Sequence, residues 1–216
     1  NNGVEKIKSS NLKAGNSVAI TKNLTLSTSE VLDNIINLEQ YNSTSSNTIQ
    51  IKSRFHNPKP ITVPPYINEE FVTFVAYTLA ESHHEEKRIK FSNKQQFMTD
   101  YFDFVSNRLF GLATISRVNK NVPEIEINSK TLTEYLKDSI NFNPATSGDK
   151  VIPSVIMGLP DELVKIFLRA MFDSEGYVPK ENKKRGAEIE FSSKSKKMAE
   201  QVQILLNRFG IVGRFK

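Results

Sequence analysis

Glu81 and Glu175 stand out because each ends a segment of helical spacing, and two such acids could together hold a metal ion. The segments FVAYTLAES (74–82) and LRAMFDSEG (168–176) share a small residue at the third place and a small residue before the glutamate. Small residues let two helix backbones approach closely, so we expect the helices to pack together and to bring the carboxylates together. The carboxylates would then repel each other and the negative helix ends. A divalent cation removes this conflict, and oxygen ligands favour Mg²⁺ or the similar Mn²⁺.

Composition narrows the classes of protein that fit. The formal net charge of +5 permits a polyanionic partner, and metals between carboxylates beside a basic surface suggest hydrolysis of phosphodiester bonds. The absence of cysteine excludes disulfides and Cys-based zinc sites, and three histidines are too few for a typical zinc site. No apolar run approaches the roughly 20 residues that span a bilayer. With no signal-peptide pattern either, we expect an intracellular protein, cytoplasmic or nuclear, without a membrane partner.

A stretch of 18 residues recurs at a constant offset of 100 positions without a gap. Six of the aligned positions are identical; they fall in the segments 91–94 and 191–194, at Met98 and Met198, and at 107–108 and 207–208. A chance recurrence of a strand end and a helix cap is one interpretation, and an internal duplication is the other. The same order of predicted elements in both halves favours the duplication, which implies a pseudo-two-fold axis and a site with one residue from each half.

Helices and strands alternate in both halves, which predicts an α+β fold. In the first half we expect helices at 68–81, 93–111 and 132–140 and strands at 88–91, 112–117 and 124–127. In the second half we expect helices at 160–173 and 194–208 and strands at 188–191 and 211–215. Residues 1–60 differ: we expect a small β unit at 4–24, a helix at 27–38 and a loop at 40–47, with a proline-rich boundary at 57–65.

Residues 167–176 (FLRAMFDSEG) resemble the LAGLIDADG motif of homing endonucleases, and residues 74–82 resemble it more weakly. The resemblance extends over 61–216. It implies a pseudo-two-fold pair of αββαββα units whose strands form a β-saddle for DNA. It also implies that Glu81 and Glu175 bind the catalytic metals, Mg²⁺ or Mn²⁺, and that both acids are catalytic. The implied activity is site-specific cleavage of double-stranded DNA with a long recognition site, by a monomer with internal pseudo-symmetry.

Two further segments are similar to those of endonucleases carried by inteins (the DOD type). The segment KVIP (150–153) lies 25 residues before Glu175, where such proteins have a Lys-x-Ile-Pro segment whose lysine assists the active site. The resemblance implies a catalytic Lys150 near the scissile phosphate; a solvated loop lysine is the alternative. Residues 4–20 are similar to the end of an intein's N-terminal splicing block, which implies a flanking host protein. The expected parts are a splicing-block remnant and linker (1–60), a first unit (61–149) and a second unit (150–216).

The sequence departs from the family pattern in three ways. Both acids are glutamates where aspartate is common, and Ser82 stands where glycine is usual. The chain stops just after Phe215, so we expect the second unit to lack its last strand and helix. The intein's N-terminal nucleophile and closing His-Asn are not found, so we expect no splicing. A catalytically degenerate DNA-binding or scaffold domain of an intein therefore stays open as the alternative to an active endonuclease.

Basic residues of the predicted strands and their connections are the candidates for contact with DNA phosphates and base edges. Solvated surface side chains are the alternative interpretation for each of them. The candidates are Lys87, Arg88, Lys90, Lys94, Arg117 and Lys120 in the first unit, and Lys180, Lys183, Lys184, Arg185, Lys194 and Arg214 in the second.

Overall fold

The computed structural model describes residues 40–45, 47–54, 57–143, 145–179 and 188–215, together with Lys8, Asn11 and Lys13. The predicted β unit at 4–24, these three residues apart, and the predicted helix at 27–38 lie outside this part of the chain. In chain order the elements are β1 (Tyr41–Ser45), β2 (Thr48–Ile51), β3 (Ile61–Thr62), α1 (Glu69–Glu81), β4 (Ser82–His84), β5 (Arg88–Ser92), α2 (Gln96–Phe110), β6 (Ile115–Asn119), β7 (Val122–Asn128), α3 (Lys130–Ile140), α4 (Ser154–Met157), α5 (Asp161–Glu175), β8 (Gly176–Tyr177), β9 (Glu190–Phe191) and α6 (Lys196–Asn207). The predicted α+β class is confirmed. None of the described helices is long and apolar enough to cross a membrane.

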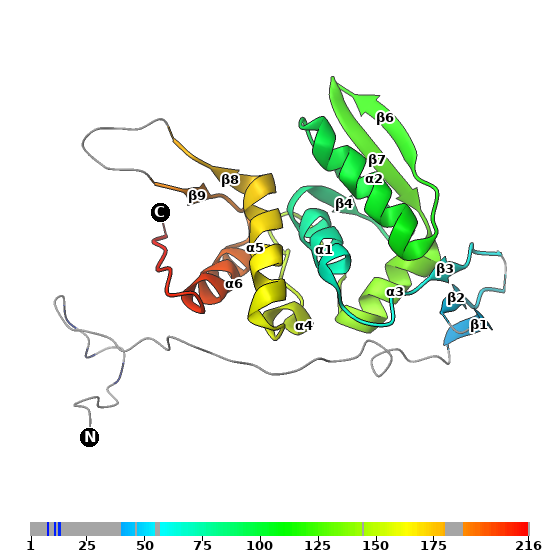
Figure 1. Cartoon of the computed structure of the whole chain (residues 1–216), viewed down its shortest axis with the longest axis horizontal. Coiled ribbons are helices and arrows are strands. Elements are labelled where there is room, and N and C mark those ends of the chain that lie inside the picture. Colours follow the sequence, from blue (N-terminus) through cyan, green and yellow to red (C-terminus); the bar gives the residue numbers. More distant parts are fainter. Residues whose placement is uncertain are drawn as a thin grey trace.

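The first unit folds as α1–β4–β5–α2–β6–β7–α3, which is the αββαββα order that the resemblance implies (Figure 1). Its four strands form an antiparallel sheet in the order β4-β5-β7-β6. Apolar side chains of β5 and β7 are buried on the face that α1, α2 and α3 contact. Side chains alternate between the two faces of a strand, so Arg88 and Lys90 of β5 lie on the opposite face, which no described helix covers. We call this the open face.

The second unit, α5–β8–β9–α6, repeats the first four elements of the first unit, and the strand register shows which positions are equivalent. The residue after each acid pairs with the phenylalanine of the repeated motif: Ser82 with Phe91, and Gly176 with Phe191. The first pair is nine positions apart and the second is fifteen. The offset is therefore 94 on the acid-bearing helices and 100 beyond the hairpins. This shared register supports an internal duplication over a chance recurrence.

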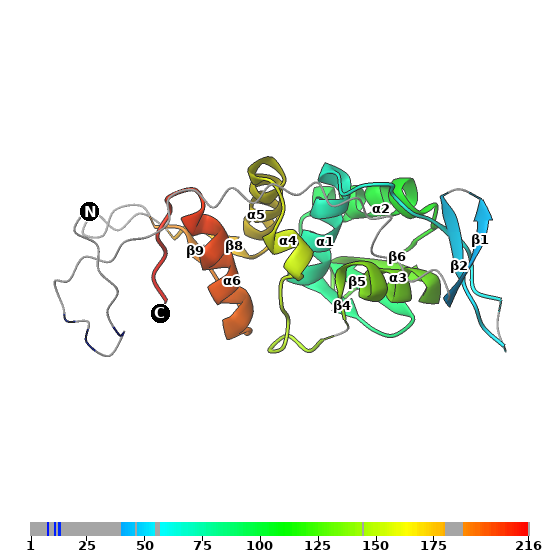
Figure 2. The same ribbon diagram turned by 90° about the horizontal axis from the view of Figure 1, so that it is seen from below.

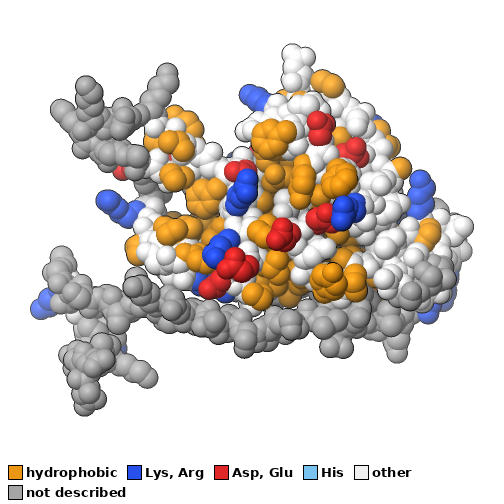
Figure 3. Space-filling view, in the orientation of Figure 1, with side chains coloured by type: hydrophobic (Ala, Val, Ile, Leu, Met, Phe, Trp, Pro, Cys, Tyr) orange, Lys and Arg blue, Asp and Glu red, His pale blue; other side chains and the backbone are white. Residues whose placement is uncertain are grey.

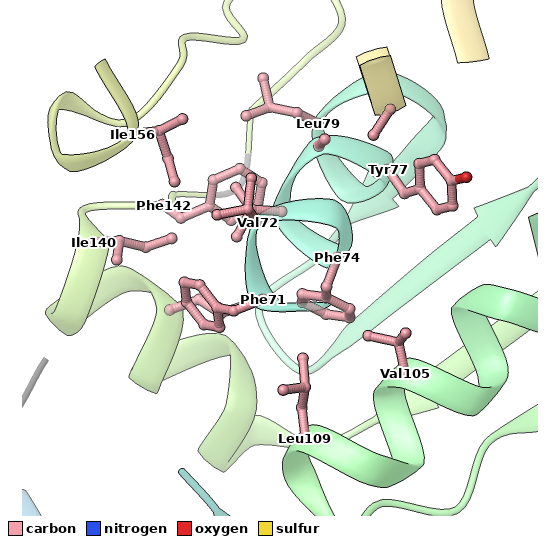
Figure 4. Packing of buried hydrophobic residues seen from close by; sticks show 14 of the residues in the cluster. Phe71, Val72, Phe74, Tyr77, Leu79, Val105, Leu109, Ile140, Phe142 and Ile156 are labelled. Carbon is pink, nitrogen blue, oxygen red and sulfur yellow. The ribbon is translucent and has the colours of Figure 1, made fainter. Parts of the chain in front are cut away.

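The core surrounds α1, whose residues from Phe71 to Ala80 are nearly all buried. In Figure 4, Phe71 and Phe74 of α1 lie close to Val105 and Leu109 of α2. The rings of Phe74 and Phe102 are stacked with centroids 5.2 Å apart. Burial of one such side chain stabilises the fold by roughly 1.5–3 kcal/mol, so many of them together fix α1 and the acid at its end.

The ends of the helices follow the local signals of the sequence. Asn68 caps α1, because its side-chain oxygen accepts a hydrogen bond of 2.9 Å from the backbone N–H of Phe71. Gly111 and Gly210 follow the two equivalent helices α2 and α6 and have φ angles of 63° and 73°. This left-handed backbone is the usual end of a helix and favours glycine.

The loop predicted at 40–47 is wrong, because β1 and β2 form an antiparallel hairpin that starts at Tyr41. β3 adds to its edge, and the three-stranded sheet lies beside α3 (Figure 2). Tyr41 is 4% exposed, and its hydroxyl donates to the Asp138 carboxylate of α3 at 2.8 Å. The polar composition of this segment hid the strands, since their few buried side chains are too sparse to stand out.

The strand predicted at 211–215 is also wrong. This segment has no regular structure, and Ile211, Val212 and Phe215 are each more than half exposed. A strand needs a neighbour for its backbone hydrogen bonds, and none of the described strands lies alongside this segment. The short elements β4 and α4 were not predicted; each has only three or four residues.

Candidate functional site

Glu81 and Glu175 are the last residues of two helices that pack against each other. α1 ends at Glu81 and α5 ends at Glu175, and these two helices contact each other more extensively than any other described pair of elements (Figures 1 and 2). Ala76, Ala80 and Ala170 are at most 6% exposed, as expected for small residues between closely packed helices. The contact between the two units therefore brings one glutamate from each unit to the same end of the helix pair.

The two acids are close enough together for the charge of Glu175 to act on Glu81. Burial, supported by the charge of Glu175, raises the pKa of Glu81 from 4.5 to about 7, and Lys150 opposes this shift. Burial also raises the pKa of Glu175, and Lys150 again opposes it. Burial is the largest cause of the raised pKa for both acids, and the charge of Glu175 adds to it only for Glu81. A positive charge between them would let both carboxylates ionise.

The ammonium of Lys150 lies within this site. It donates hydrogen bonds to three backbone carbonyls at the end of α1: Leu79 at 2.7 Å, Ala80 at 3.1 Å and Ser82 at 3.3 Å. The last carbonyls of a helix lack intrahelical partners and carry the negative end of its dipole, so a cation there is favourable. Burial lowers the pKa of Lys150, while the charges of Glu175 and Glu81 raise it. The side chain of Lys150 is partly buried, and its ammonium is held against the end of α1 by these three hydrogen bonds.

Asn93 is a site residue that was not predicted. Its Nδ2 donates to Oε1 of Glu81 at 3.2 Å, and its Oδ1 accepts from the backbone N–H of Gln95 at 2.8 Å. The second bond fixes the amide, so Asn93 orients the carboxylate. The repeat carried a signal for this position: the equivalent Ser193 accepts from the N–H of Ser195 at 3.0 Å in the same turn. Neither Ser92 nor Asn93 is the helix cap, because α2 starts only at residue 96.

The described candidate DNA-contacting residues of the first unit lie on the four-stranded sheet or in the connections around it, whereas Arg214 lies in a segment without regular structure and not on the strand predicted at 211–215. Arg88, Lys90 and Arg117 are on the open face of the four-stranded sheet, and Lys87, Lys94 and Lys120 are exposed in the connections around it. In the second unit Lys194 and Arg214 are exposed, while Lys180, Lys183, Lys184 and Arg185 lie outside the described residues.

The open face carries acids as well as bases. Arg117 pairs with Glu126 across the strands at 3.8 Å, and Arg88 is paired with Glu85. Glu124 accepts a hydrogen bond from Ser92 at 3.2 Å on the same face. The face in view in Figure 3 is also mixed, with basic and acidic side chains interspersed among apolar ones over the described residues. A DNA ligand would therefore meet both donors and acceptors, which suits contact with base edges as well as phosphates.

The oxygen donors of the site fit a hard divalent cation whose coordination is completed by groups from outside the protein. Within the described ranges, no group of three or more His, Cys, Asp or Glu side chains could hold a metal ion alone. Mg²⁺ commonly takes one or two carboxylates from the protein and fills its other positions with water and substrate phosphate. Glu81 and Glu175 supply those carboxylates, so water and a substrate phosphate would fill the other positions of a metal bound here.

Residues 162–216 match the family model of the LAGLIDADG-like domain. The matched residues span α5, β8, β9 and α6, including Glu175. Among solved structures, the fold is similar to I-DmoI in complex with DNA and Mn, with 14% identity and a TM-score of 0.46 over 67% of this chain and 81% of that chain. It is also similar to full-length DUF199/WhiA from Thermatoga maritima, with 15% identity and a TM-score of 0.43 over 68% of this chain and 46% of that chain.

Curated relatives match most of this chain but only a small part of their own length. The glutamine–fructose-6-phosphate aminotransferase of Methanocaldococcus jannaschii is 25% identical over 166 residues, which are 76% of this chain and 15% of that protein. The replication factor C small subunit of the same organism is 32% identical over 154 residues, or 69% and 8%. An A-type ATP synthase subunit of Pyrococcus abyssi is 27% identical over 154 residues, or 71% and 15%. This chain thus spans less than a fifth of each relative.

Proposed function

We propose that this chain is a site-specific endonuclease that hydrolyses phosphodiester bonds of double-stranded DNA, with divalent metal held by Glu81 and Glu175. The observation that carries the proposal is the convergence of three charged groups: two acids at the ends of packed helices, and the ammonium of Lys150 beside both. The match to the LAGLIDADG-like domain over residues 162–216 supports it. Because the proposed substrate is DNA, the proposal includes an intracellular location, in the cytoplasm or the nucleus.

Each residue of the site has a separate role in this proposal. Glu81 and Glu175 are the metal ligands, and the amide of Asn93 keeps the Glu81 carboxylate in one orientation. Bound Mg²⁺ or Mn²⁺ would supply polarisation of the phosphate and a water of lowered pKa. Lys150 already faces the carbonyls at the end of α1, and its positive charge would stabilise the negative charge that develops on the phosphate.

The open face of the sheet is the surface proposed to bind DNA. The major groove admits a β-ribbon, and its base pairs present distinct patterns of donors and acceptors. Arg88, Lys90 and Arg117 would contact phosphates or guanine, whereas Glu124 could accept a hydrogen bond from the amino group of cytosine. With pseudo-symmetric units on both sides of the helix pair, the proposal includes a long site contacted by a monomer.

The proposal also places the endonuclease inside a host protein, as part of an intein. The three relatives carry unrelated names, an aminotransferase, a replication factor and an ATP synthase component, and the matching segment makes up 8–15% of each. An element that inserts into unrelated genes predicts this distribution. The resemblance of residues 4–20 to a splicing block and of 150–153 to a Lys-x-Ile-Pro segment supports the same interpretation.

Cleavage of a library of randomised duplex DNA, with Mg²⁺ or Mn²⁺, tests the proposed activity. We expect cutting at a long discrete site, and we expect Glu81→Gln or Glu175→Gln to abolish it while binding persists. Glu162→Gln is the matched control, because Glu162 lies on α5 and is exposed far from the helix end. Binding without any cutting by the unsubstituted chain would refute the enzyme and leave the second candidate, a degenerate DNA-binding or scaffold domain, which the two glutamates in place of aspartates favour.

A further inference from the structure

Gln201 of α6 holds the segment that carries Lys150. The backbone N–H of Ile152 donates to Oε1 of Gln201 at 2.8 Å, and Nε2 of Gln201 donates to the carbonyl oxygen of Ile152 at 2.9 Å. One side-chain amide thus satisfies both backbone groups of a single residue, as a neighbouring strand would. Ile152 is 2% exposed and has no helix or strand of its own to provide these partners. Gln201 therefore fixes both the position and the orientation of this peptide.

The N-cap residue of α6 fixes the same segment two positions earlier, at Lys150 itself. The hydroxyl of Ser195 donates to the carbonyl oxygen of Lys150 at 2.6 Å and accepts from the N–H of Met198 at 3.1 Å. Ser195 is 1% exposed and is the N-cap of α6. The start of α6 and its second turn together hold the backbone at residues 150–152, so a long and otherwise flexible lysine side chain begins from a fixed point.

These contacts link the two units through a single side chain. α6 belongs to the second unit, whereas the ammonium of Lys150 ends on the Leu79 and Ala80 carbonyls of α1 in the first unit. The repeat does not require a glutamine here, because the position equivalent to Gln201 in α2 is Tyr101, whose ring packs near Tyr77. The amide pair with Ile152 is thus specific to the second unit and to the segment that it holds.

We infer that Gln201 is a positioning residue for Lys150: its paired hydrogen bonds with Ile152 set the place of the ammonium at the acid pair. The expected effect on cleavage rests on the proposed function. The expected effect on the position of Lys150 is independent of that function. Loss of the pair frees the segment, and the ammonium loses its fixed position beside the carboxylates. Changes in groups that support an active site typically lower activity by about 10- to 100-fold.

Two measurements on the full chain test the inference, with Gln201→Leu as the variant and Gln203→Leu as the matched control. Gln203 lies on the same helix, is half-buried, and donates to the carbonyl of Gly213 at 2.8 Å, away from residues 150–152. The first measurement is the rate at which an amine-reactive ester labels Lys150, read by mass spectrometry with the exposed Lys196 as internal reference. We expect slow labelling in the unsubstituted chain and the control, and clearly faster labelling in Gln201→Leu.

The second measurement is single-turnover cleavage of the duplex recovered from the randomised library. We expect Gln201→Leu to lower the rate at saturating DNA by about 10- to 100-fold with little change in DNA affinity. In a Lys150→Met background the same substitution should have no further effect, because a residue that acts through Lys150 has nothing left to position. Gln201→Glu keeps the acceptor for the Ile152 N–H, so its cleavage rate should lie between those of the unsubstituted chain and Gln201→Leu. It replaces Gln201→Leu in both measurements if that variant does not fold.

The two measurements separate the possible failures. Unchanged labelling of Lys150 in both Gln201 variants would overturn the inference, whatever happens to cleavage. An equal loss of cleavage with and without the Lys150 side chain would show a general structural effect and would also overturn it. If the unsubstituted chain cuts no DNA while Lys150 labelling still rises in Gln201→Leu, the proposed endonuclease fails but the positioning of Lys150 stands.

Discussion

Glu81→Gln should stabilise the metal-free protein, because it removes a negative charge whose burial destabilises the folded state. The pKa of Glu81 is raised from 4.5 to about 7, mainly by burial and further by Glu175. At about 1.36 kcal/mol per pKa unit this difference corresponds to at most about 3.4 kcal/mol. Glu81 is only half-buried, so solvent screening reduces the expected gain to about 1–2 kcal/mol. A glutamine can still accept the hydrogen bond from Asn93, so the substitution changes little but the charge.

The sign of the pH dependence follows from the raised pKa. Between pH 4.5 and about 7 the folded state binds more protons at Glu81 than the unfolded state does, so this residue makes the folded state less stable as pH rises. The difference in unfolding free energy between Glu81→Gln and the unsubstituted chain should therefore be near zero below pH 4.5. It should reach about 1–2 kcal/mol in favour of the variant at pH 8.

Urea unfolding at several pH values, with a chelator or with Mn²⁺, measures both effects. With chelator at pH 8 we expect the variant to be the more stable protein. With Mn²⁺ we expect the order to reverse, because a ligand that binds only the folded state stabilises the unsubstituted chain alone. Glu162→Gln on the exposed face of α5 is the control and should show neither effect. If Glu81→Gln is less stable than the unsubstituted chain in chelator at pH 8, the two carboxylates do not repel each other as argued.

Two further substitutions test the surroundings of the site. Burial lowers the pKa of His84 to about 4 and leaves its ring nitrogens without partners among the described residues, so the stability it contributes is present above pH 6.5 and is lost as pH falls toward 4. His84→Phe should remove this loss in urea unfolding, whereas the same change at the exposed His83 should leave it; an unaltered acid profile in His84→Phe would contradict the assignment. Gly176→Ala should lower cleavage on the order of 100-fold, because an added Cβ would lie 2.2 Å from the carbonyl oxygen of Phe172 and must displace the neighbouring acid. Gly148→Ala, which meets nothing within 4 Å, is the control, and equal cleavage by both alanine variants would refute the steric argument.

The acid pair could be predicted because local signals and the repeat agree. Asn68 marks the start of α1, and the run of apolar residues after it marks a buried helix. The shared small residues of the segments 74–82 and 168–176 then assigned Glu81 and Glu175 to equivalent places, and the strand register after each acid shows the same equivalence. The prediction needed no knowledge of the packing, since two copies of one pattern imply one shared axis.

The groups around the acids could not be predicted in the same way, because their contacts join residues that are distant in the chain. Gln201 and Ile152 are 49 positions apart, and Lys150 reaches carbonyls about 70 positions before it. A glutamine in the middle of a helix has no local pattern that shows whether it faces solvent or a backbone peptide. The prediction of a loop at 40–47 was wrong for a related reason. Tyr41 is buried by a contact with Asp138 of α3, and no local pattern reveals this contact.

The pseudo-two-fold axis relates the two acids but not their environments. Glu81 receives the amide of Asn93, and the end of its helix is capped by Lys150. In the described part of the chain the Glu175 carboxylate accepts no comparable hydrogen bond, since the residue equivalent to Asn93 is the shorter Ser193, whose hydroxyl only supports its own turn. The two packed helices therefore supply two carboxylates at one place, and the differences between their surroundings leave Glu81 the better fixed of the two. Lys150 makes the largest contribution to this difference, because the second unit holds its backbone while its ammonium binds the end of α1 in the first unit.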